Sequence, residues 1–288
     1  MLHTDTTCRR LIITGVGYRS DFDAVSHRNV YRDVDIKPNI GAVVALCAAQ
    51  SGYRLVLVSR TAQKLENIRS SIIEIVPSAQ IDLWPVDLLN PDDVKKCVSL
   101  LQNDCEIDLV HSAGLGAGTY QLPGDNPYLE IGETPVELPS LEFESVVRSL
   151  LIQVQCLLPR WRKQKQSRIV VISSMSGIRA VPFGYSHSSA KAGLHHAVRS
   201  MSLELNPLGI RVSEVLPGIV NTGMYDPPLV DSAIRKMGRS FGYEYEQGKL
   251  PQMDPMAVAE AVLLCLNTTA HILQISLVAD GQFPFHGS

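Results

Sequence analysis

Short apolar segments alternate with longer amphipathic segments along most of the chain. Each short segment is rich in Val, Ile and Leu, which is typical of strands buried on both faces of a parallel sheet. The predicted strands span residues 11–13, 54–59, 81–86, 108–111, 168–173, 210–216 and 275–278. The predicted helices span residues 40–51, 62–75, 92–101, 141–162, 186–205 and 255–266. This alternation predicts an α/β fold with a doubly wound parallel sheet, whose ligands bind beyond the carboxyl ends of the strands.

Three longer segments interrupt the alternation and predict loops at the ligand-binding edge. They comprise residues 18–38, 121–140 and 224–253. Loops of this length in a compact domain are commonly functional or disordered. We expect residues 18–38 to form an insertion over the cofactor or the substrate entrance, and the other two to lie on the substrate side. No repeat divides the chain, so residues 1–288 are expected to form a single domain.

The composition excludes several classes of partner. The formal net charge of −3 does not favour nucleic acid or an anionic membrane surface. No segment has the pattern of a signal peptide or a membrane-spanning helix. The cysteines lack the paired spacing of a metal site, and their surroundings predict buried free thiols in a reducing compartment. They are Cys8, Cys47, Cys97, Cys105, Cys156 and Cys265. We therefore expect a cytoplasmic protein without a bound metal.

A glycine-bearing turn follows the first predicted strand. Thr14-Gly15-Val16-Gly17 precedes the insertion, and Asn39-Ile40-Gly41 follows it and opens a helix. Glycines allow a tight turn and let a diphosphate approach the helix N-terminus, where free N–H groups and the helix dipole hold it. Asn39 tolerates a left-handed backbone and can also cap the helix. The segment predicts a Rossmann-type nucleotide site, split by an insertion.

Ser174, His187 and Lys191 form the candidate chemical site. Ser174 follows a predicted strand, whereas His187 and Lys191 lie four residues apart and share one face of a predicted helix. An imidazole has an ordinary pKa of about 6.5, and a nearby ammonium favours its neutral form. His187 can therefore exchange a proton, but Lys191 opposes its cationic form. Tyr185 can supply a phenol only if it precedes the helix, because within the helix it points about 240° away from Lys191.

These segments resemble the short-chain dehydrogenase/reductase family. In that family a serine precedes the pattern Tyr-x-x-x-Lys; Ser174 and Lys191 match it, and His187 stands at the tyrosine position. The glycine-bearing turn is similar to the family's TGxxxGIG, with Asn39 at the middle glycine. The resemblance implies that Ser174 hydrogen-bonds the substrate oxygen and that Lys191 holds the nicotinamide ribose.

Two further motifs extend the resemblance, which covers about Leu11 to Gly281. His111-Ser112-Ala113-Gly114 is similar to the family's Asn-Asn-Ala-Gly, and residues 217–222 are similar to its PGxxxT. The cofactor that the resemblance implies is NADP(H), because Arg60 after the second strand suits the extra phosphate. The implied cofactor-binding residues are Gly15, Gly17, Asn39, Ile40, Gly41, Ser59, Arg60, Asp87, Leu88, Ser112, Ala113, Gly114, Lys191, Pro217, Gly218, Ile219 and Thr222. A homodimer or homotetramer is also implied.

Two departures from the family pattern leave the function open. His187 replaces the tyrosine, and no asparagine lies between Phe143 and Pro159, where the family anchors a water for proton relay. The polar residues of that stretch are Arg148, Ser149, Gln153 and Gln155. One hypothesis is an NADP(H)-dependent oxidoreductase acting on a carbonyl or alcohol of a small molecule, with His187 as acid/base. The alternative is a non-redox enzyme of the same fold (cyclase, isomerase or dehydratase), or a catalytically inactive NADP-binding protein.

Overall fold

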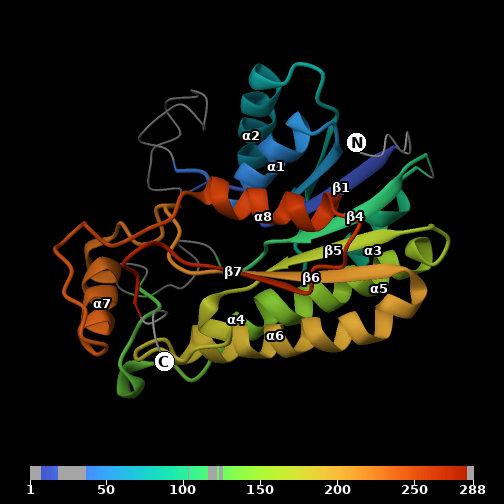
Figure 1. Ribbon diagram of the computed structural model, residues 1–288. Coiled ribbons are helices and arrows are strands. Elements are labelled where there is room, and N and C mark those ends of the chain that lie inside the picture. Colours follow the sequence, from blue (N-terminus) through green and yellow to red (C-terminus); the bar gives the residue numbers. More distant parts are fainter. Residues whose placement is uncertain (1–7, 19–36, 103, 116–121, 123–125, 284–288) are drawn as a thin grey trace.

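A single parallel sheet organises the protein. The computed structural model describes residues 8–18, 37–102, 104–115, 122 and 126–283. Its strands lie in the order β3-β2-β1-β4-β5-β6-β7, and every neighbouring pair is parallel (Figure 1). They are β1 (Arg9–Thr14), β2 (Arg54–Ser59), β3 (Ile81–Pro85), β4 (Glu106–His111), β5 (Ser167–Ile172), β6 (Ile210–Pro217) and β7 (Gln274–Leu277). The predicted doubly wound α/β fold is confirmed.

Helices cover both faces of the sheet. They are α1 (Ile40–Gln50), α2 (Ala62–Ile75), α3 (Pro91–Ser99), α4 (Leu138–Phe143), α5 (Ser149–Trp161), α6 (Tyr185–Leu205), α7 (Pro228–Arg239) and α8 (Pro255–Asn267). One apolar core joins α1, α2 and α8 to the sheet, and a second joins α3, α5 and α6 to the opposite face (Figure 1). None of the helices in the described part of the chain combines the length and hydropathy needed to cross a bilayer.

The order of the strands creates a switch point between β1 and β4. From β1 the chain moves outward through β2 and β3, and it then returns to place β4 on the other side of β1. The loops after these two strands therefore diverge and leave a crevice at the carboxyl ends. Helix α7 and the segments around it lie at that end of the sheet (Figure 1).

Two predicted segments differ from the structure. The predicted helix 141–162 begins earlier, as α4, and contains a π-helical turn over Glu144–Arg148 before α5. The predicted loop 224–253 contains α7, whose Val230, Ile234 and Met237 are buried at helical spacing. A π-helical turn displaces backbone carbonyls from the regular ladder and commonly occurs at functional sites.

The prediction of six free thiols was wrong for two of them. Cys8 and Cys105 form a disulfide, whereas Cys47, Cys97, Cys156 and Cys265 are free. The pairing follows from the sheet, because Arg9 is the register partner of Glu106 and each cysteine immediately precedes one of these residues. The residues are far apart in sequence, so only the pairing of β1 with β4 brings them together.

The two ends of the insertion in the glycine-bearing turn lie next to each other. Residues 19–36, which make up most of the predicted insertion, lie outside the described residues. At its ends Tyr18 and Pro38 form an antiparallel bridge, and the Asn39 N–H donates to the Gly17 carbonyl at 3.0 Å. The two halves of the turn are therefore joined directly, although they are separated in sequence.

Candidate active site

A cavity of about 440 Å³ occupies the switch point, beyond the carboxyl ends of the strands. Segments following six of the strands, β1 to β6, contribute to its wall. Of the residues predicted from sequence, those that line it are Gly15, Gly17, Asn39, Ile40, Ser59, Arg60, Asp87, Leu88, Ser112, Ala113, Gly114, Ser174, His187, Lys191, Pro217, Gly218 and Thr222. Gly41, Ile219 and Tyr185 do not line it. The structure thus brings most of the predicted residues to one continuous site.

Gly15 and Gly41 allow close packing at the turn after β1. Gly15 has a φ of +69°, and a Cβ there would lie 2.4 Å from the Ser112 carbonyl oxygen. A Cβ on Gly41 would lie 2.9 Å from the Gly15 carbonyl oxygen. Any larger residue at Gly15 would therefore strain the backbone and collide with the loop after β4. Gly41 supports the cavity from behind without forming its surface.

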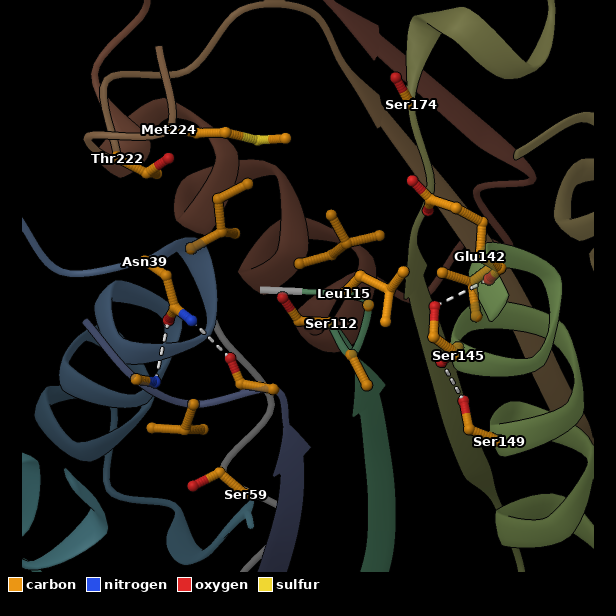
Figure 2. Close-up of a pocket in the computed structure, with 18 of the residues that line it drawn as sticks. Asn39, Ser59, Ser112, Leu115, Glu142, Ser145, Ser149, Ser174, Thr222 and Met224 are labelled. Atoms are coloured by element: carbon orange, nitrogen blue, oxygen red, sulfur yellow. Dashed lines mark hydrogen bonds between the residues drawn. The ribbon is translucent and has the colours of Figure 1, made fainter. Parts of the chain in front are cut away.

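Asn39 uses its side chain to hold the split turn together. Its Oδ1 accepts from the N–H groups of Gly17 at 3.1 Å and Ala42 at 3.0 Å, and its Nδ2 donates to the Gly15 carbonyl at 2.7 Å (Figure 2). Its φ of −79° is an ordinary extended value, so a left-handed backbone is not needed at this position. The asparagine caps α1, as predicted, and its side chain also links the two halves of the turn.

The far end of the cavity carries positive charge. Arg60 is exposed after β2, and Lys64 of α2 lines the same region. The Lys64 ammonium donates to the Tyr18 carbonyl at 3.3 Å and lies 5.5 Å from the Tyr18 ring centroid. Asp87 accepts from the Leu89 N–H, while the cap of α3 is Asn90. Two cations on one part of the cavity wall suit an anionic group such as a phosphate.

His111 is a buried neutral element beneath the cavity. Its Nε2 lies 3.0 Å from the Val146 carbonyl in the π-helical turn, and its Nδ1 lies 3.1 Å from Gln153 Nε2. The first contact requires an N–H on Nε2 and the second requires acceptance at Nδ1, which together fix the neutral tautomer. Burial and the charge of Lys191 lower the pKa of His111 to about 4. His111 therefore ties β4 to the turn before α5.

The segment that follows β6 packs closely against the side chain of Gln282. A Cβ on Gly218 would lie 2.4 Å from Gln282 Oε1, so glycine is required at this approach. The same Gln282 oxygen accepts from the N–H of Ile219 at 2.9 Å. Ile219 is 5 % exposed and faces a separate apolar cluster with Val230 and Phe283. Ile219 thus supports the segment, whereas Pro217, Gly218 and Thr222 reach the cavity.

The opposite end of the cavity holds the candidate chemical residues. Ser174 follows β5, and His187 and Lys191 lie on the first turns of α6. The Lys191 ammonium donates to the Ile172 carbonyl at 3.4 Å. Burial lowers the pKa of Lys191 to about 8, against the raising effect of the Glu142 and Glu214 carboxylates. The ammonium therefore retains its charge at neutral pH and loses it in mildly alkaline solution.

Tyr185 does not join this group. It is the first residue of α6, its side chain points away from the cavity, and the residue is 57 % exposed. Because it lies within the helix, its direction differs from that of Lys191, as helix geometry predicts. Tyr225, which the sequence did not indicate, does line the cavity, but burial raises its pKa. Among the titratable groups of α6 that share a helix face with Lys191, His187 is thus the one that lines the cavity.

Sequence reasoning missed a buried carboxylate in the same place. Glu142 of α4 lines the cavity, is 2 % exposed, and points its carboxylate toward the side where Ser174 lies (Figure 2). The signal was present in the sequence: Leu138, Glu142, Val146 and Leu150 recur at intervals of four, and the other three are apolar and buried. A glutamate within a buried stripe is rarely accidental.

His195 has a structural partner. Its Nδ1 lies 2.6 Å from a carboxylate oxygen of Glu214 on β6, and both residues are buried. This pair packs α6 onto the sheet beneath Lys191. These contacts give His195 a packing role between α6 and β6. Among the described residues, no cluster of three or more His, Cys, Asp or Glu side chains is arranged to bind a metal ion.

Comparison with known proteins identifies the family. Residues 38–229 match the family described as short chain dehydrogenase. An oxidoreductase of uncharacterized function from Staphylococcus aureus strain MW2 is 24% identical over 235 residues, which cover 81% of this chain and 88% of the relative. A similarly described protein of Staphylococcus saprophyticus is 26% identical over the same shares. The chain therefore belongs to the short chain dehydrogenase family, and these matches support an oxidoreductase.

Solved structures share the fold across nearly the whole chain. A short chain oxidoreductase from Pseudomonas aeruginosa PAO1, solved with NADPH and described as containing an atypical catalytic center, has a TM-score of 0.73 at 20% identity, covering 96% of this chain and 97% of its own. L-sorbose reductase from Gluconobacter frateurii, complexed with NADPH and L-sorbose, has a TM-score of 0.71 at 18% identity, covering 96% of both chains.

Proposed function

We propose that the protein is an NADP(H)-dependent oxidoreductase that interconverts a carbonyl and an alcohol on a small molecule, with His187 as its acid/base. The observation that carries the proposal is the single cavity, which joins the cationic end at Arg60 and Lys64 to the chemical end at Ser174, His187 and Lys191. For a long anionic cofactor, such a cavity provides a positive counter-charge at one end and proton-transfer groups at the other. NADPH-bound relatives of the same fold add support.

The residues of the cavity fit this cofactor. Gly15 and Gly218 line the cavity, and neither carries a side chain that would keep a ligand away from the backbone. The first turn of α1 faces the cavity through Asn39 and Ile40, as a diphosphate site requires. Arg60 suits the phosphate that distinguishes NADP from NAD. When bound, NADPH supplies the hydride for reduction of the carbonyl carbon.

The chain's own residues supply the rest of the reduction. Ser174 donates a hydrogen bond to the substrate oxygen, and His187 in its cationic form gives that oxygen a proton as the alcohol forms. His187 is left neutral and regains its proton from water. Lys191 holds the cofactor ribose and remains charged at neutral pH because its pKa is about 8. The reverse reaction uses neutral His187 as the base.

Turnover by the purified protein tests this proposal. Binding of NADPH and NADH is measured first by calorimetry, and the loss of reduced nicotinamide is then followed with a panel of ketones and aldehydes, with products identified by mass spectrometry. We expect NADPH to bind more tightly than NADH and to be consumed with at least one carbonyl. Tight binding of NADPH without turnover in either direction would overturn it.

One observation favours the second candidate function, a cofactor-binding or non-redox protein of the same fold. Tyr185 on α6 is 57 % exposed and does not line the cavity, so it does not supply the phenol that acts as the acid in the family pattern. This candidate and the main proposal differ in a single outcome, because only an oxidoreductase consumes NADPH in proportion to alcohol formed. A cytoplasmic location and a homodimer or homotetramer also stay predictions.

A further inference from the structure

Glu142 is a carboxylate where the fold alone calls for an apolar side chain. It lies between Leu138, 3 % exposed, and Val146, 1 % exposed, on the buried stripe that runs from α4 into the π-helical turn. Burying a carboxylate costs free energy unless a compensating charge or hydrogen bond is available. The cost indicates that something at this position requires a negative charge.

The compensating groups come from α6. A carboxylate oxygen of Glu142 lies 3.8 Å from Nδ1 of His187, whose side chain is 15 % exposed. That distance is longer than a hydrogen bond but within the range of an ion pair when the imidazole is protonated. The Glu142 charge also acts on Lys191, where it opposes the effect of burial. One carboxylate therefore faces two basic groups, one helical turn apart.

The remaining groups around His187 do not offer the same charge. The Tyr128 ring packs edge-on against the imidazole, with 6.4 Å between the ring centroids. Tyr225 lines the cavity as a neutral phenol, because burial raises its pKa. Glu144 and Arg148 of the π-helical turn lie 3.7 Å apart and are about half exposed. On β6, Glu214 pairs with His195. Of the described residues around His187, Glu142 is the carboxylate within ion-pair distance.

We propose that Glu142 is the positioning residue of His187: its carboxylate orients the imidazole and stabilises the cationic form that donates a proton in carbonyl reduction. This inference rests on the proposed function of His187 as acid/base. The replacement of a phenol by an imidazole explains why a carboxylate is needed. A phenol that loses a proton becomes an anion, which Lys191 stabilises, whereas an imidazole that must carry a proton becomes a cation, which Lys191 destabilises.

The geometry also assigns the nitrogen that serves the substrate. With Nδ1 turned toward Glu142, Nε2 is the atom available to a substrate oxygen. In reduction the Nε2–H bond breaks, the proton goes to that oxygen, and the pair of electrons stays on the ring. The Glu142 carboxylate exchanges no proton in this step. Water returns a proton to Nε2 before the next turnover.

Titration of the His187 ring by NMR tests the proposal without relying on turnover. The signal is assigned by its absence from His187→Phe, and its titration midpoint is compared between the unmodified protein and Glu142→Gln. We expect the midpoint to fall by about one to three pH units in Glu142→Gln, because a carboxylate within ion-pair range stabilises a charge by that amount. Glu144→Gln, which removes a half-exposed carboxylate two residues away, should leave the midpoint unchanged.

Kinetics provide the second readout. With saturating cofactor, the pH at which reduction is half-lost should fall by a similar amount in Glu142→Gln, and Glu142→Asp should restore part of the shift. If Glu142→Gln does not fold, Glu142→Asp is scored by the same NMR titration, where an unchanged midpoint overturns the proposal. An unchanged midpoint in folded Glu142→Gln also overturns the positioning role of Glu142, even if His187 proves to be the acid.

Full activity of His187→Phe has a different consequence, because it overturns the proposed function. In that case a shifted midpoint in Glu142→Gln would still show that Glu142 pairs with His187.

Discussion

At the scale of single residues, the chemistry of His187 depends on its charged neighbours. Lys191 lies one helical turn away on α6, and the Glu142 carboxylate lies 3.8 Å from Nδ1. A cation suits a group that becomes an anion, and an anion suits a group that becomes a cation. The histidine and the buried glutamate therefore make sense as a pair, whereas either one alone would conflict with its surroundings.

Arg60 is expected to select NADP(H) over NAD(H). Arg60→Ala should lower NADPH affinity about ten- to a hundredfold, because a charge-assisted hydrogen bond contributes about 1.5–3 kcal/mol. NADH affinity should change little, since NADH lacks the phosphate. Calorimetric titration of both cofactors measures the difference. Arg162→Ala, at an exposed arginine outside the cavity, is the matched control, and an equal loss for both cofactors in Arg60→Ala would refute selection by Arg60.

Lys191 is expected to make cofactor affinity depend on alkaline pH. Burial lowers its pKa to about 8, so the ammonium is charged below that pH and neutral above it. Because the cofactor is an anion, NADPH affinity should fall as the pH rises from about 7 to about 9.5. Lys191→Met should bind more weakly at neutral pH and lose this dependence. A fall in affinity that persists in Lys191→Met would assign it to another group.

At the scale of elements, His111 links the end of β4 to the π-helical turn and α5. Its two ring nitrogens contact Val146 and Gln153, and acceptance from Gln153 at Nδ1 needs the neutral ring. The π-helical turn and the histidine therefore support each other, since the turn offers a carbonyl that a buried donor can reach. This link fixes the wall that carries Ser145 and Ser149 beside Glu142 (Figure 2).

His111 is also expected to make the fold sensitive to acid. Its pKa is about 4 in the folded protein and about 6.5 in the unfolded chain, so between these values the unfolded state binds more protons. Stability should therefore fall as the pH drops from about 6.5 to about 4, by roughly 3 kcal/mol in all. Urea unfolding at several pH values measures this, with His111→Asn as the comparison. An identical pH dependence in His111→Asn would exclude the histidine as its source.

The elements that the sequence predicted well are those with a strong local pattern. The strands and the capped helix α1 follow from apolar runs and from Asn39, and the parallel, doubly wound sheet follows from their alternation. Helix α7 was missed although Val230, Ile234 and Met237 have helical spacing, because proline, glycine and tyrosine surround it. The Cys8–Cys105 disulfide depends on the register of β1 with β4, which no local pattern reveals.

In the candidate site too, residues in local motifs were predicted from the sequence, and a residue placed by a tertiary contact was not. Glycine turns, Arg60, Ser174 and Lys191 were predicted from ordered motifs, and the cavity brings them together. Glu142 was not predicted, because a glutamate in an amphipathic helix is ordinarily exposed. Its function depends on the approach of α4 to α6, a tertiary contact between segments far apart in sequence. Motifs thus predict where a site lies, while the charge balance within it depends on packing.

At the scale of the whole molecule, one cavity at the switch point joins the predicted cofactor-binding residues to the candidate chemical residues. Arg60 after β2 and Lys64 of α2 supply its cationic end, and the segment after β5 with α6 supplies its chemical end. Helix α7 and the segment before it close the same end of the sheet (Figure 1). A cofactor that spans this cavity would touch both halves of the doubly wound sheet, and this arrangement supports the proposed oxidoreductase.

Turnover by His187→Phe, with Tyr185→Phe beside it, tests the central claim most directly. Phenylalanine keeps an aromatic ring and removes the proton, so His187→Phe should bind NADPH normally while carbonyl reduction falls about 10²- to 10⁴-fold. Tyr185→Phe should retain activity, because its hydroxyl lies outside the cavity. The measurement is single-turnover oxidation of bound NADPH with a saturating carbonyl substrate. Unchanged turnover in His187→Phe, or its loss in Tyr185→Phe, would contradict the account.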